Sequence, residues 1–451
     1  YYFMYDDRSL PDQYETSLPQ IFPESAPGNF TYLKDINKWV MTVFRNYQWD
    51  LNYKNPQVFI EMQKVLIFLA NQGVDILRLD APAFIWKEMG TSCQNLPQAH
   101  TLLQLMKRSM QIVAPGVKFI AEAIVRPQEI VKYFAKGTND PECDIAYHAT
   151  LMALIWNSLA TSKVDLLYRA LHQMPEKPLG TTWINYIRGH DDIGLGFDDE
   201  HIYQAGYDAR MHRKFLYDYY TGRYQGSPAK GALFMYNPAN GDARISGTLA
   251  SLAGLETALK SKDSLLIERA TQKILLTHAV IMTFGGLPMI FSGDEIGLLN
   301  DYSFINNGAK REDNRWLHRP MMNWETAKDR TQTGTVTHTL FRGLQKLIKI
   351  RKALPELVDF NNLSLVNSGN QHVFIFKRYH NRQKLLVLVN FQSSVQLINK
   401  FVISSQGFKN WDKIIDLYTG KPVKCKKNFI KLSGYQFSFL QEIHTKKKPA
   451  S

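Results

Sequence analysis

Apolar and polar positions follow two different periods along the first three quarters of the chain. Residues 55–73, "NPQVFIEMQKVLIFLANQG", have helical spacing, with Asn55 placed to cap the helix, Pro56 at its first position and Gly73 just past its end. Residues 74–79 then carry apolar side chains on both faces, which is typical of a strand covered on both sides in a parallel sheet. The alternation of these two patterns predicts βα units.

Five strands are predicted for this sheet, and the pattern places them near residues 74, 117, 143, 182 and 287. Further helices are expected at 95–115, 149–171, 264–286 and 334–352. A long insertion runs from Asp191 to about residue 255. Its Gly-rich part, "GDARISGTLASLAG", lacks the strand–turn–helix context of a phosphate-binding loop and is expected to be an ordinary loop.

The two ends of the chain have different patterns. Residues 1–55 are rich in Pro, Asn, Asp and aromatic residues with little periodicity, and we expect a long loop region that carries function on a rigid scaffold. After residue 371 the pattern changes to short alternating strands, such as "HVFIFKRY" and "KLLVLVNF". This change predicts a separate all-β domain at the C-terminus.

Composition narrows the class of protein. Apolar residues make up 45% and charged residues 21%, as in ordinary soluble globular proteins. No apolar run reaches the roughly 18 residues that a membrane-spanning helix needs. The net charge is +13, but the basic residues are scattered apart from the terminal "HTKKKPAS", which is expected to be a solvated tail. We therefore expect neither a nucleic acid nor a membrane as partner, and the oligomeric state stays open.

Cysteines and histidines suggest no metal or redox chemistry. Cys93, Cys143 and Cys425 are odd in number and far apart, which favours free thiols in a reducing compartment such as the cytoplasm. No metal-ligand spacing stands out, and neither a metal nor a cofactor is expected. The histidines on helical stretches are expected to be core or surface residues: His148, His172 and His278.

Three acidic residues end predicted strands. They are Asp80, Glu122 and Asp191, the last beside His190. Carboxyl ends of barrel strands meet at one mouth, where active sites lie. Side chains alternate along a strand, so Arg78 lies on the same face as Asp80, where its charge would lower the pKa of the carboxyl group. A structural ion pair is an equally weighted interpretation of this stretch alone. Paired carboxylates about 5–5.5 Å apart are what retaining glycoside chemistry requires.

The motifs around these residues resemble those of a known family. Three stretches are similar to three of the four signature regions of glycoside hydrolase family 13, the α-amylase family: "GVDILRLDAPAFIWK", "FIAEAIV" and "IRGHDDIG". Four more resemble the amylosucrases within it: "QWDLNYKNPQV", "MGTSCQNLPQAH", "YNPANGDARISGT" and "DNRWLHRP". The resemblance covers essentially the whole chain. It implies a nucleophile at Asp80, a general acid/base at Glu122 and a transition-state stabiliser at Asp191.

The same resemblance implies a substrate and further site residues. Arg78 and His190 match sugar-subsite residues of the family, and four others match the sucrose pocket and acceptor sites: Phe44, Asp192, Arg244 and Arg315. The implied activity is a retaining glucosyltransferase that uses sucrose, releases fructose and extends an α-1,4-glucan. Sucrose hydrolysis is the alternative, and Arg244 weakly favours transfer. No cofactor is implied, since amylosucrases resemble the calcium-free members.

Departures from the family pattern change the expected fold. The first signature region and any candidates for the first three barrel strands are absent. We therefore expect a partial (β/α)8 TIM barrel of about strands 4–8, with inserted loop domains and a C-terminal antiparallel β-sandwich. The absent region would supply a histidine for the sugar and an aspartate to pair with Arg315. An inactive fragment that binds glucan weakly is the competing hypothesis, and Pro82 and Gly189 are smaller departures beside catalytic positions.

The expected domains follow from this comparison. They are a loop domain over 1–55, barrel strands 4–7 over 56–191, an inserted loop domain over 192–255, the end of the barrel over 256–360 and a β domain over 361–451.

Overall fold

The computed structural model describes residues 1–23, 26–136, 141–237, 241–359 and 361–443. The chain divides into two compact units. The first unit comprises residues 1–147, 175–183 and 235–242, and the second comprises residues 148–174, 184–234 and 243–451. Three expected features fall partly or wholly outside the described residues, namely part of the "YNPANGDARISGT" motif, residue 360 at a domain boundary and the lysine-rich tail.

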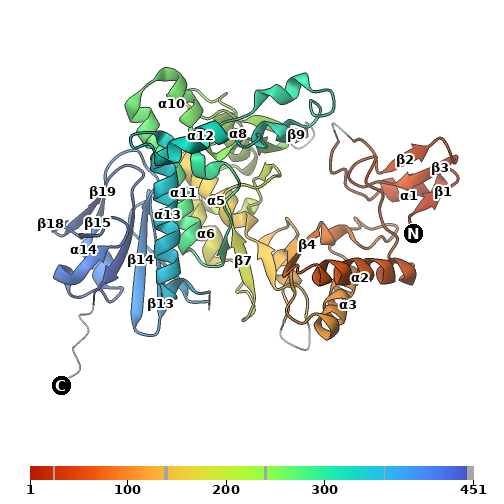
Figure 1. The fold of residues 1–451 in the computed structure, drawn as a ribbon, viewed down its shortest axis with the longest axis horizontal. Coiled ribbons are helices and arrows are strands. Elements are labelled where there is room, and N and C mark those ends of the chain that lie inside the picture. Colours follow the sequence, from red (N-terminus) through yellow and green to blue (C-terminus); the bar gives the residue numbers. More distant parts are fainter. Residues whose placement is uncertain (24–25, 137–140, 238–240, 360, 444–451) are drawn as a thin grey trace. The chain divides into compact units, whose positions relative to one another are not determined.

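The first unit contains a parallel sheet that carries two of the expected catalytic residues (Figure 1). Its helices and strands are β1 (Met4–Tyr5), α1 (Ser9–Glu15), β2 (Phe30–Leu33), β3 (Lys38–Met41), α2 (Pro56–Asn71), β4 (Ile76–Asp80), α3 (Pro97–Val113), β5 (Lys118–Glu122), α4 (Pro127–Ile130) and β6 (Ile145–Tyr147). Strands β4 and β5 pair in parallel from Ile76 opposite Lys118 to Asp80 opposite Glu122, and β5 pairs in parallel with β6.

Helix α2 has the boundaries that its sequence predicts. The Asn55 side chain accepts a hydrogen bond from the Gln57 amide, and Pro56 occupies the first helical position. The chain leaves the helix through Gly73, whose φ of +88° is a left-handed conformation that glycine adopts at little cost. Strand β4 then begins at Ile76, two residues after the predicted start at residue 74, and ends at Asp80.

The N-terminal segment is more ordered than the sequence pattern suggests. Residues expected to be a long loop region contain helix α1 and a three-stranded antiparallel sheet in the order β1-β3-β2. Each of these strands has four residues or fewer, which is too short for alternation to stand out. Aromatic packing supports the sheet, since the ring of Phe30 lies within 6.2 Å of Tyr5 and Tyr14.

The second unit contains the remaining parallel strands and most of the helices. Its elements before the C-terminal strands are α5 (Ala149–Thr161), α6 (Asp165–His172), β7 (Thr182–Asn185), β8 (Ile193–Gly194), α7 (Asp199–Gln204), α8 (Ala209–Tyr220), β9 (Ala232–Asn237), β10 (Asp242–Ser246), α9 (Leu249–Ala253), α10 (Leu255–Ser261), α11 (Ser264–Thr283), β11 (Leu287–Pro288), α12 (Trp324–Lys328) and α13 (Val336–Ala353). Three of these strands have some residues in the first unit. They are residues 182–183 of β7, residues 235–237 of β9 and residue 242 of β10.

Strands β7 and β11 pair in parallel, so five parallel strands are present where the sequence predicts them. Strand β7 ends at Asn185, and strand β11 ends at Pro288. The expected helix over 149–171 is two helices, α5 and α6. The chain breaks between them at Ser162, which adopts a left-handed conformation with φ of 56°. The predicted α/β class is confirmed.

The insertion after β7 is folded rather than loop-like. Helices α7 and α8 lie in the chain between β8 and β9, and the three strands form a sheet in the order β8-β10-β9. The Gly-rich stretch expected to be a loop forms β10 and helix α9, which Thr248 caps by accepting a hydrogen bond from the Ser251 amide. The loop expectation was wrong because it rested on the glycine content. The alternating residues Ala243 and Ile245 of β10, which are buried, are the strand signal in this stretch.

The C-terminal strands form two antiparallel sheets (Figure 1). One has the order β12-β13-β14-β20-β16-β17 and the other β15-β19-β18. Their bounds are β12 (Leu363–Val366), β13 (Val373–His380), β14 (Gln383–Asn390), β15 (Gln396–Asn399), α14 (Lys400–Ser404), β16 (Ile414–Asp416), β17 (Lys421–Pro422), β18 (Cys425–Lys426), β19 (Phe429–Leu432) and β20 (Phe437–Glu442). Apolar residues of both sheets, such as Ile375 and Ile430, belong to one buried cluster, which confirms the expected sandwich.

A buried arginine connects the sandwich to the turn before β11. The Arg378 guanidinium donates hydrogen bonds to the carbonyls of Phe284, Glu356 and Val358 and to the Asn362 side chain. Burial lowers the pKa of Arg378 to about 10. A side chain at Gly285, where φ is +124°, would run into this guanidinium. Gly285 is thus required both by its conformation and by the arginine beside it.

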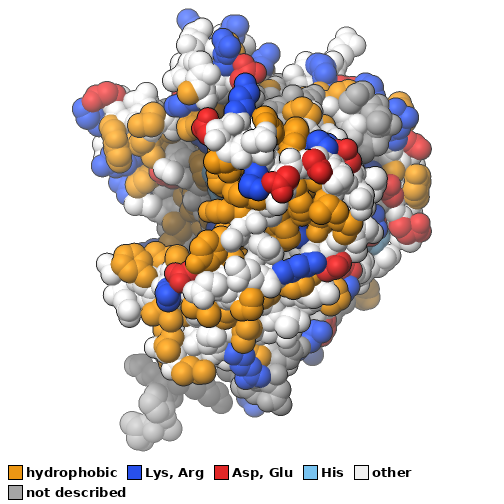
Figure 2. Space-filling view, turned by 90° about the vertical axis from the view of Figure 1, so that its right-hand side faces the viewer, with side chains coloured by type: hydrophobic (Ala, Val, Ile, Leu, Met, Phe, Trp, Pro, Cys, Tyr) orange, Lys and Arg blue, Asp and Glu red, His pale blue; other side chains and the backbone are white. Residues whose placement is uncertain are grey.

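Surface and thiol features complete the description. Cys93 and Cys143 are buried, Cys425 is partly exposed, and all three are free thiols, as expected. No helix within the described ranges is both long enough and apolar enough to cross a membrane. Apolar side chains lie among charged ones on the face shown in Figure 2.

Replacing Gly285 with Ala is expected to destabilise the protein by about 3 kcal/mol, since the new methyl group adds overpacking to an unfavourable φ. Gly73→Ala is the matched control, because φ is also positive there but nothing lies within 4 Å of the added atom. The control should cost only about 1 kcal/mol. Denaturant unfolding of both variants measures the difference, and equal losses would contradict the proposed role of Arg378.

Candidate active site

Parallel pairing brings two of the predicted catalytic carboxylates together in the first unit. Asp80 is the last residue of β4 and lies in register with Glu122, the last residue of β5. Both side chains therefore leave the sheet at its carboxyl edge and on one face. They differ in exposure, since the Asp80 side chain is 70% exposed and the Glu122 side chain 17%. The two carboxylates thus have different surroundings, as different acid–base roles require.

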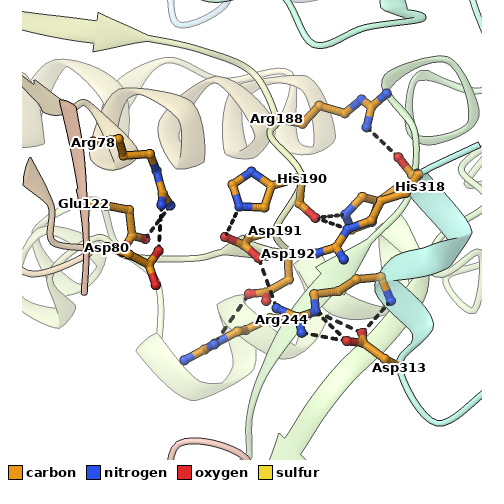
Figure 3. Close-up of polar contacts among 12 residues, drawn as sticks. Arg78, Asp80, Glu122, Arg188, His190, Asp191, Asp192, Arg244, Asp313 and His318 are labelled. Atoms are coloured by element: carbon orange, nitrogen blue, oxygen red, sulfur yellow. Dashed lines mark hydrogen bonds and ion pairs between the residues drawn. The ribbon is translucent and has the colours of Figure 1, made fainter. Parts of the chain in front are cut away.

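Arg78 lies between these two carboxylates (Figure 3). Its Nη1 donates a hydrogen bond of 2.6 Å to Asp80 Oδ1, and its Nη2 lies 3.9 Å from Glu122 Oε1. Its Nε donates to the hydroxyl of Tyr147, at 3.3 Å, from the end of β6. Burial alone would lower the pKa of Arg78, but the bond to Asp80 and the charge of Glu122 raise it. The guanidinium stays charged and offsets the repulsion between the carboxylates.

The backbone just after Asp80 is strained. Ala81 adopts a left-handed conformation with φ of 42°, which costs a non-glycine residue about 1–2 kcal/mol. Its amide donates a hydrogen bond of 3.0 Å to Glu122 Oε2. Pro82 follows at the start of a short 3-10 helix, and a proline disfavours the right-handed helical conformation in the residue before it. The departure at Pro82 therefore contributes to holding the amide that contacts Glu122.

A cavity of about 480 Å³ opens beside Asp80 within the first unit. Phe44 and Phe84 line it together with Arg78 and Asp80, and the two rings meet edge to face at 5.2 Å between centroids. Phe44 thus lies where the sequence predicts a sugar-contacting residue. The cavity is large enough for a small sugar ligand, since such sites typically have volumes of about 300–1,000 Å³.

The second unit carries the third predicted carboxylate, Asp191, in the loop between β7 and β8. Asp191 Oδ2 lies 3.0 Å from Nε2 of His190, and Oδ1 accepts hydrogen bonds from Arg315 at 3.0 Å and Arg319 at 3.4 Å. Burial alone would raise the pKa of Asp191, but His190 and the two arginines lower it to about 2. Asp191 is therefore an anion at any physiological pH.

Two further carboxylates hold the arginines of this cluster in place (Figure 3). Asp313 caps a 3-10 helix at Asn314–His318 and accepts hydrogen bonds from Nε and Nη2 of Arg315, at 2.9 and 2.6 Å. Asp192 Oδ2 lies 3.6 Å from Nε of Arg244, which β10 supplies. Burial raises the pKa of Asp192, and the charge of Arg244 opposes that rise. The aspartate expected to pair with Arg315 from elsewhere in the enzyme has local counterparts here, Asp313 and Asp191.

A buried network fixes the loop that carries His190 and Asp191. The His190 carbonyl accepts hydrogen bonds from His318 Nε2 at 3.0 Å and Arg319 Nε at 2.6 Å. The Gly247 amide donates to Nδ1 of His318, so the ring proton lies on Nε2. Burial and the neighbouring Arg188 lower the pKa of His318 to about 3, which keeps the ring neutral. A neutral ring with this tautomer can make both bonds at once.

Arg188 connects the same loop to the segment after β11. Its Nε donates a hydrogen bond of 2.8 Å to Asp294 Oδ1, and its Nη1 donates to the His318 carbonyl at 2.9 Å. Its guanidinium also lies over the ring of Phe291, 4.3 Å from the centroid. The Arg188 and Asp294 side chains are only 1% and 3% exposed. Such a pair depends on both partners, because either charge alone would be buried without compensation.

The structure thus brings the nine predicted site residues into two groups. Phe44, Arg78, Asp80 and Glu122 lie in the first unit, and His190, Asp191, Asp192, Arg244 and Arg315 lie in the second. Sequence reasoning did not select five residues that contact these groups: Tyr147, Arg188, Asp313, His318 and Arg319. Four of them lie inside the quoted motifs "IRGHDDIG" and "DNRWLHRP", and Tyr147 ends a predicted strand, so a fuller use of the same signals would have found them.

Comparisons with known proteins identify the family. The α-amylase catalytic domain model matches residues 1–195. Glucosylglycerate phosphorylase of Escherichia coli K12 is 26% identical over 387 residues, which cover 84% of this chain and 64% of the relative. Glucosylglycerate phosphorylase of Allomeiothermus silvanus is 34% identical over 181 residues, 40% of this chain and 31% of the relative. The family model thus places residues 1–195 of the chain in the α-amylase family.

Solved structures agree with the α-amylase fold. Sucrose 6F-phosphate phosphorylase from Thermoanaerobacter thermosaccharolyticum superposes with a TM-score of 0.61 at 17% identity, over 84% of this chain and 70% of that one. Isomaltulose synthase SmuA from Protaminobacter rubrum gives 0.60 at 16% identity, over 98% and 78%. The chain spans less than two thirds of the length of the curated relatives named above. Within the described part of this α-amylase family chain, no cluster of three or more metal-ligating side chains occurs.

Breaking the buried Arg188–Asp294 pair is expected to destabilise the second unit. Asp294→Asn should cost about 3–5 kcal/mol, because it leaves the Arg188 charge buried without a partner. The double variant Arg188→Met/Asp294→Leu removes both charges and should cost clearly less. Glu325→Gln is the control, since its pair with Lys328 is exposed and should change stability by less than about 1 kcal/mol. Unfolding free energies test this, and equal losses for the single and double variants would contradict it.

The low pKa of Asp191 predicts a pH-dependent contribution to stability. The pKa is about 2 in the folded protein and higher in the unfolded chain, so the ionised group favours folding above about pH 4. That contribution declines as the pH falls from about 4 to 2. Asp191→Asn should therefore be less stable than the unaltered protein at pH 6, with a narrower gap at pH 3. Urea unfolding midpoints at the two pH values measure the gap, and a constant gap would show that Asp191 is not held ionised.

Proposed function

We propose that this chain carries the catalytic groups of a retaining enzyme that transfers glucosyl units from an α-glucoside. The observation that carries the proposal is the placement of Asp80 and Glu122 in register at the ends of two parallel strands, with Arg78 against both. Retaining glycoside chemistry uses two such carboxyl groups, one as nucleophile and one as acid and base. Membership of the α-amylase family supports the same chemistry.

In the proposed mechanism, Asp80 is the nucleophile. Its carboxylate attacks the anomeric carbon, and the bond from that carbon to the leaving oxygen breaks as Glu122 gives that oxygen its proton. The product is a β-glucosyl ester of Asp80. An acceptor hydroxyl then gives its proton to Glu122 and attacks the same carbon, which frees the Asp80 carboxylate and restores the α configuration. Arg78 keeps Asp80 in position, and the exposure of Asp80 suits a group that must reach the sugar.

The family resemblance implies roles for the site residues of the second unit. Asp191, which is ionised, matches the residue that stabilises the positive charge of an oxocarbenium-like transition state. His190 matches a residue that donates to the sugar. By the same resemblance, Arg244, Asp192 and Arg315 of the second unit and Phe44 of the first match residues that bind the substrate or the acceptor. No metal or cofactor has a role in this scheme.

For the donor and acceptor, we propose sucrose and an α-glucan, as in amylosucrases. Four motifs in this sequence, those that resemble amylosucrases, support that assignment. The names of two similar structures, sucrose 6F-phosphate phosphorylase and isomaltulose synthase, are consistent with a sucrose-related donor. A second candidate acceptor is inorganic phosphate. The relatives named glucosylglycerate phosphorylase favour it.

The first experiment tests the nucleophile. Glu122→Gln is incubated with α-glucosyl fluoride, whose fluoride leaves without acid assistance, and is then digested for mass spectrometry. Because the variant lacks the base for the second step, one hexosyl unit should remain on the peptide that contains Asp80. Glu122→Gln/Asp80→Asn is the matched control and should carry no label. A label on any other residue, or none in a folded sample, would overturn the proposal.

The acceptor is tested on the unaltered protein with sucrose. Fructose release with glucan growth supports the amylosucrase-like assignment, and release of free glucose supports hydrolysis. Glucose 1-phosphate formed only when phosphate is added supports the phosphorylase alternative. No fructose under any condition would overturn sucrose as the donor, while the labelling experiment decides independently whether Asp80 is the nucleophile.

A further inference from the structure

The net positive charge of the protein is concentrated in its C-terminal β sandwich. Residues 361–451 contain 15 of the 54 Lys and Arg residues but only 3 of the 41 Asp and Glu residues. They therefore contribute 12 of the 13 net positive charges. The sequence-based expectation that basic residues are scattered is wrong at the level of domains, because residues 1–360 are almost neutral in sum and the excess lies in one region.

Half of this net charge lies between residues 400 and 431, where eight lysines outnumber two aspartates. The segment has eight lysines and no arginine: Lys400, Lys409, Lys413, Lys421, Lys424, Lys426, Lys427 and Lys431. Seven are exposed, and Lys400 is partly buried with its ammonium 4.8 Å from the centre of the Trp411 ring. In the part of the chain that the structure describes, none of the eight forms an ion pair. The charge is thus not neutralised within the protein.

The outer face of the small sheet β15-β19-β18 carries two of these lysines, Lys426 and Lys431, beside apolar side chains. Leu397 pairs with Lys431, and Phe429 pairs with both Asn399 and Lys426. Directly opposed residues share a face, so these five side chains lie on one side of the sheet. The opposite side carries Ile398, Ile430 and Leu432, which belong to the buried core of the sandwich. The outer side is left to solvent, and we call it the lysine face.

Apolar residues next to the sheet enlarge the lysine face. Leu397 is 52% exposed, and Phe401 at the start of α14 is 76% exposed. Val395, two residues before Leu397 in the chain, is also exposed. The hairpin between β18 and β19 also carries lysines, since Lys426 ends β18 and Lys427 lies in the turn. Lys427 and Asn428 both have positive φ, as a two-residue type I′ turn requires. The hairpin tip therefore presents charge beside the apolar side chains of the face.

We propose that the lysine face is a peripheral docking surface for a lipid bilayer that contains anionic headgroups. Lysines near such a bilayer bind through charge alone, and aliphatic and phenyl side chains enter the boundary between headgroups and acyl chains. A nucleic acid fits the face less well, because base recognition relies on arginine forks and stacked aromatic rings. This proposal departs from the sequence-based expectation that no membrane is a partner. That expectation rested on the absence of a long apolar run, which peripheral docking does not require.

Vesicle co-sedimentation of the whole chain tests the proposal. Binding is expected to vesicles of phosphatidylcholine with phosphatidylglycerol, to fall with added salt, and to be weak with phosphatidylcholine alone. Each lysine near an anionic surface contributes roughly five-fold in partitioning, so Lys426→Gln/Lys431→Gln should weaken binding about 25-fold. Lys260→Gln/Lys349→Gln is the control with the same loss of charge, from exposed positions on α10 and α13, and should change binding little.

A second variant separates a bilayer from other polyanions. Leu397→Ser/Phe401→Ser keeps every charge but removes exposed apolar side chains, so it should weaken vesicle binding and leave binding to an oligouridylate unchanged. Unaltered thermal unfolding of each variant establishes that the sandwich remains folded. The proposal is overturned if vesicles containing anionic lipid are not bound, if both lysine variants lose binding equally, or if the Ser variant binds vesicles normally.

Discussion

The contact between Arg78 and two carboxylates is the interaction on which the catalytic arrangement depends. Parallel pairing places Asp80 beside Glu122, and two negative charges at adjacent strand ends would repel each other. A guanidinium two residues before Asp80 lies on the same face and contacts both. The Ala81 amide gives Glu122 a further partner at the cost of backbone strain. The geometry of this group therefore follows from strand register together with one cation.

In the second unit, buried polar groups hold the loop that carries Asp191. Asp191 is exposed enough to meet a ligand, whereas the loop that carries it is held from behind by Arg188 and His318. Both of these residues are buried, so each must satisfy its polar atoms within the protein. The Gly247 amide fixes the tautomer of His318, and β10, which ends just before Gly247, also carries Arg244. The folded insertion and the loop of Asp191 are thereby coupled through one imidazole ring.

Local sequence signals were sufficient where one segment decides its own structure. The bounds of α2 follow from Asn55, Pro56 and Gly73, and the five parallel strands lie where apolar runs indicate them. The signals failed for β1 to β3 and for β10, which lie in segments rich in Pro, Asn, Asp or Gly. These strands gain stability from partners elsewhere in the chain, which the composition of their own segments does not reveal.

The sequence by itself determined the resemblance to the α-amylase family and the order of the candidate site residues along the strands, because strand periodicity and motif spacing are local properties. It also determined that Arg78 and Asp80 share a face. Only the tertiary structure decided that Asp313 and Arg319 join Arg315 around Asp191, and that Arg188 is paired with a residue 106 positions away. It likewise decided that Lys426 and Lys431 share one sheet face with Leu397 and Phe429. The physical reason is that ion pairs and sheet faces depend on distances in space, and chain folding sets those distances independently of sequence separation.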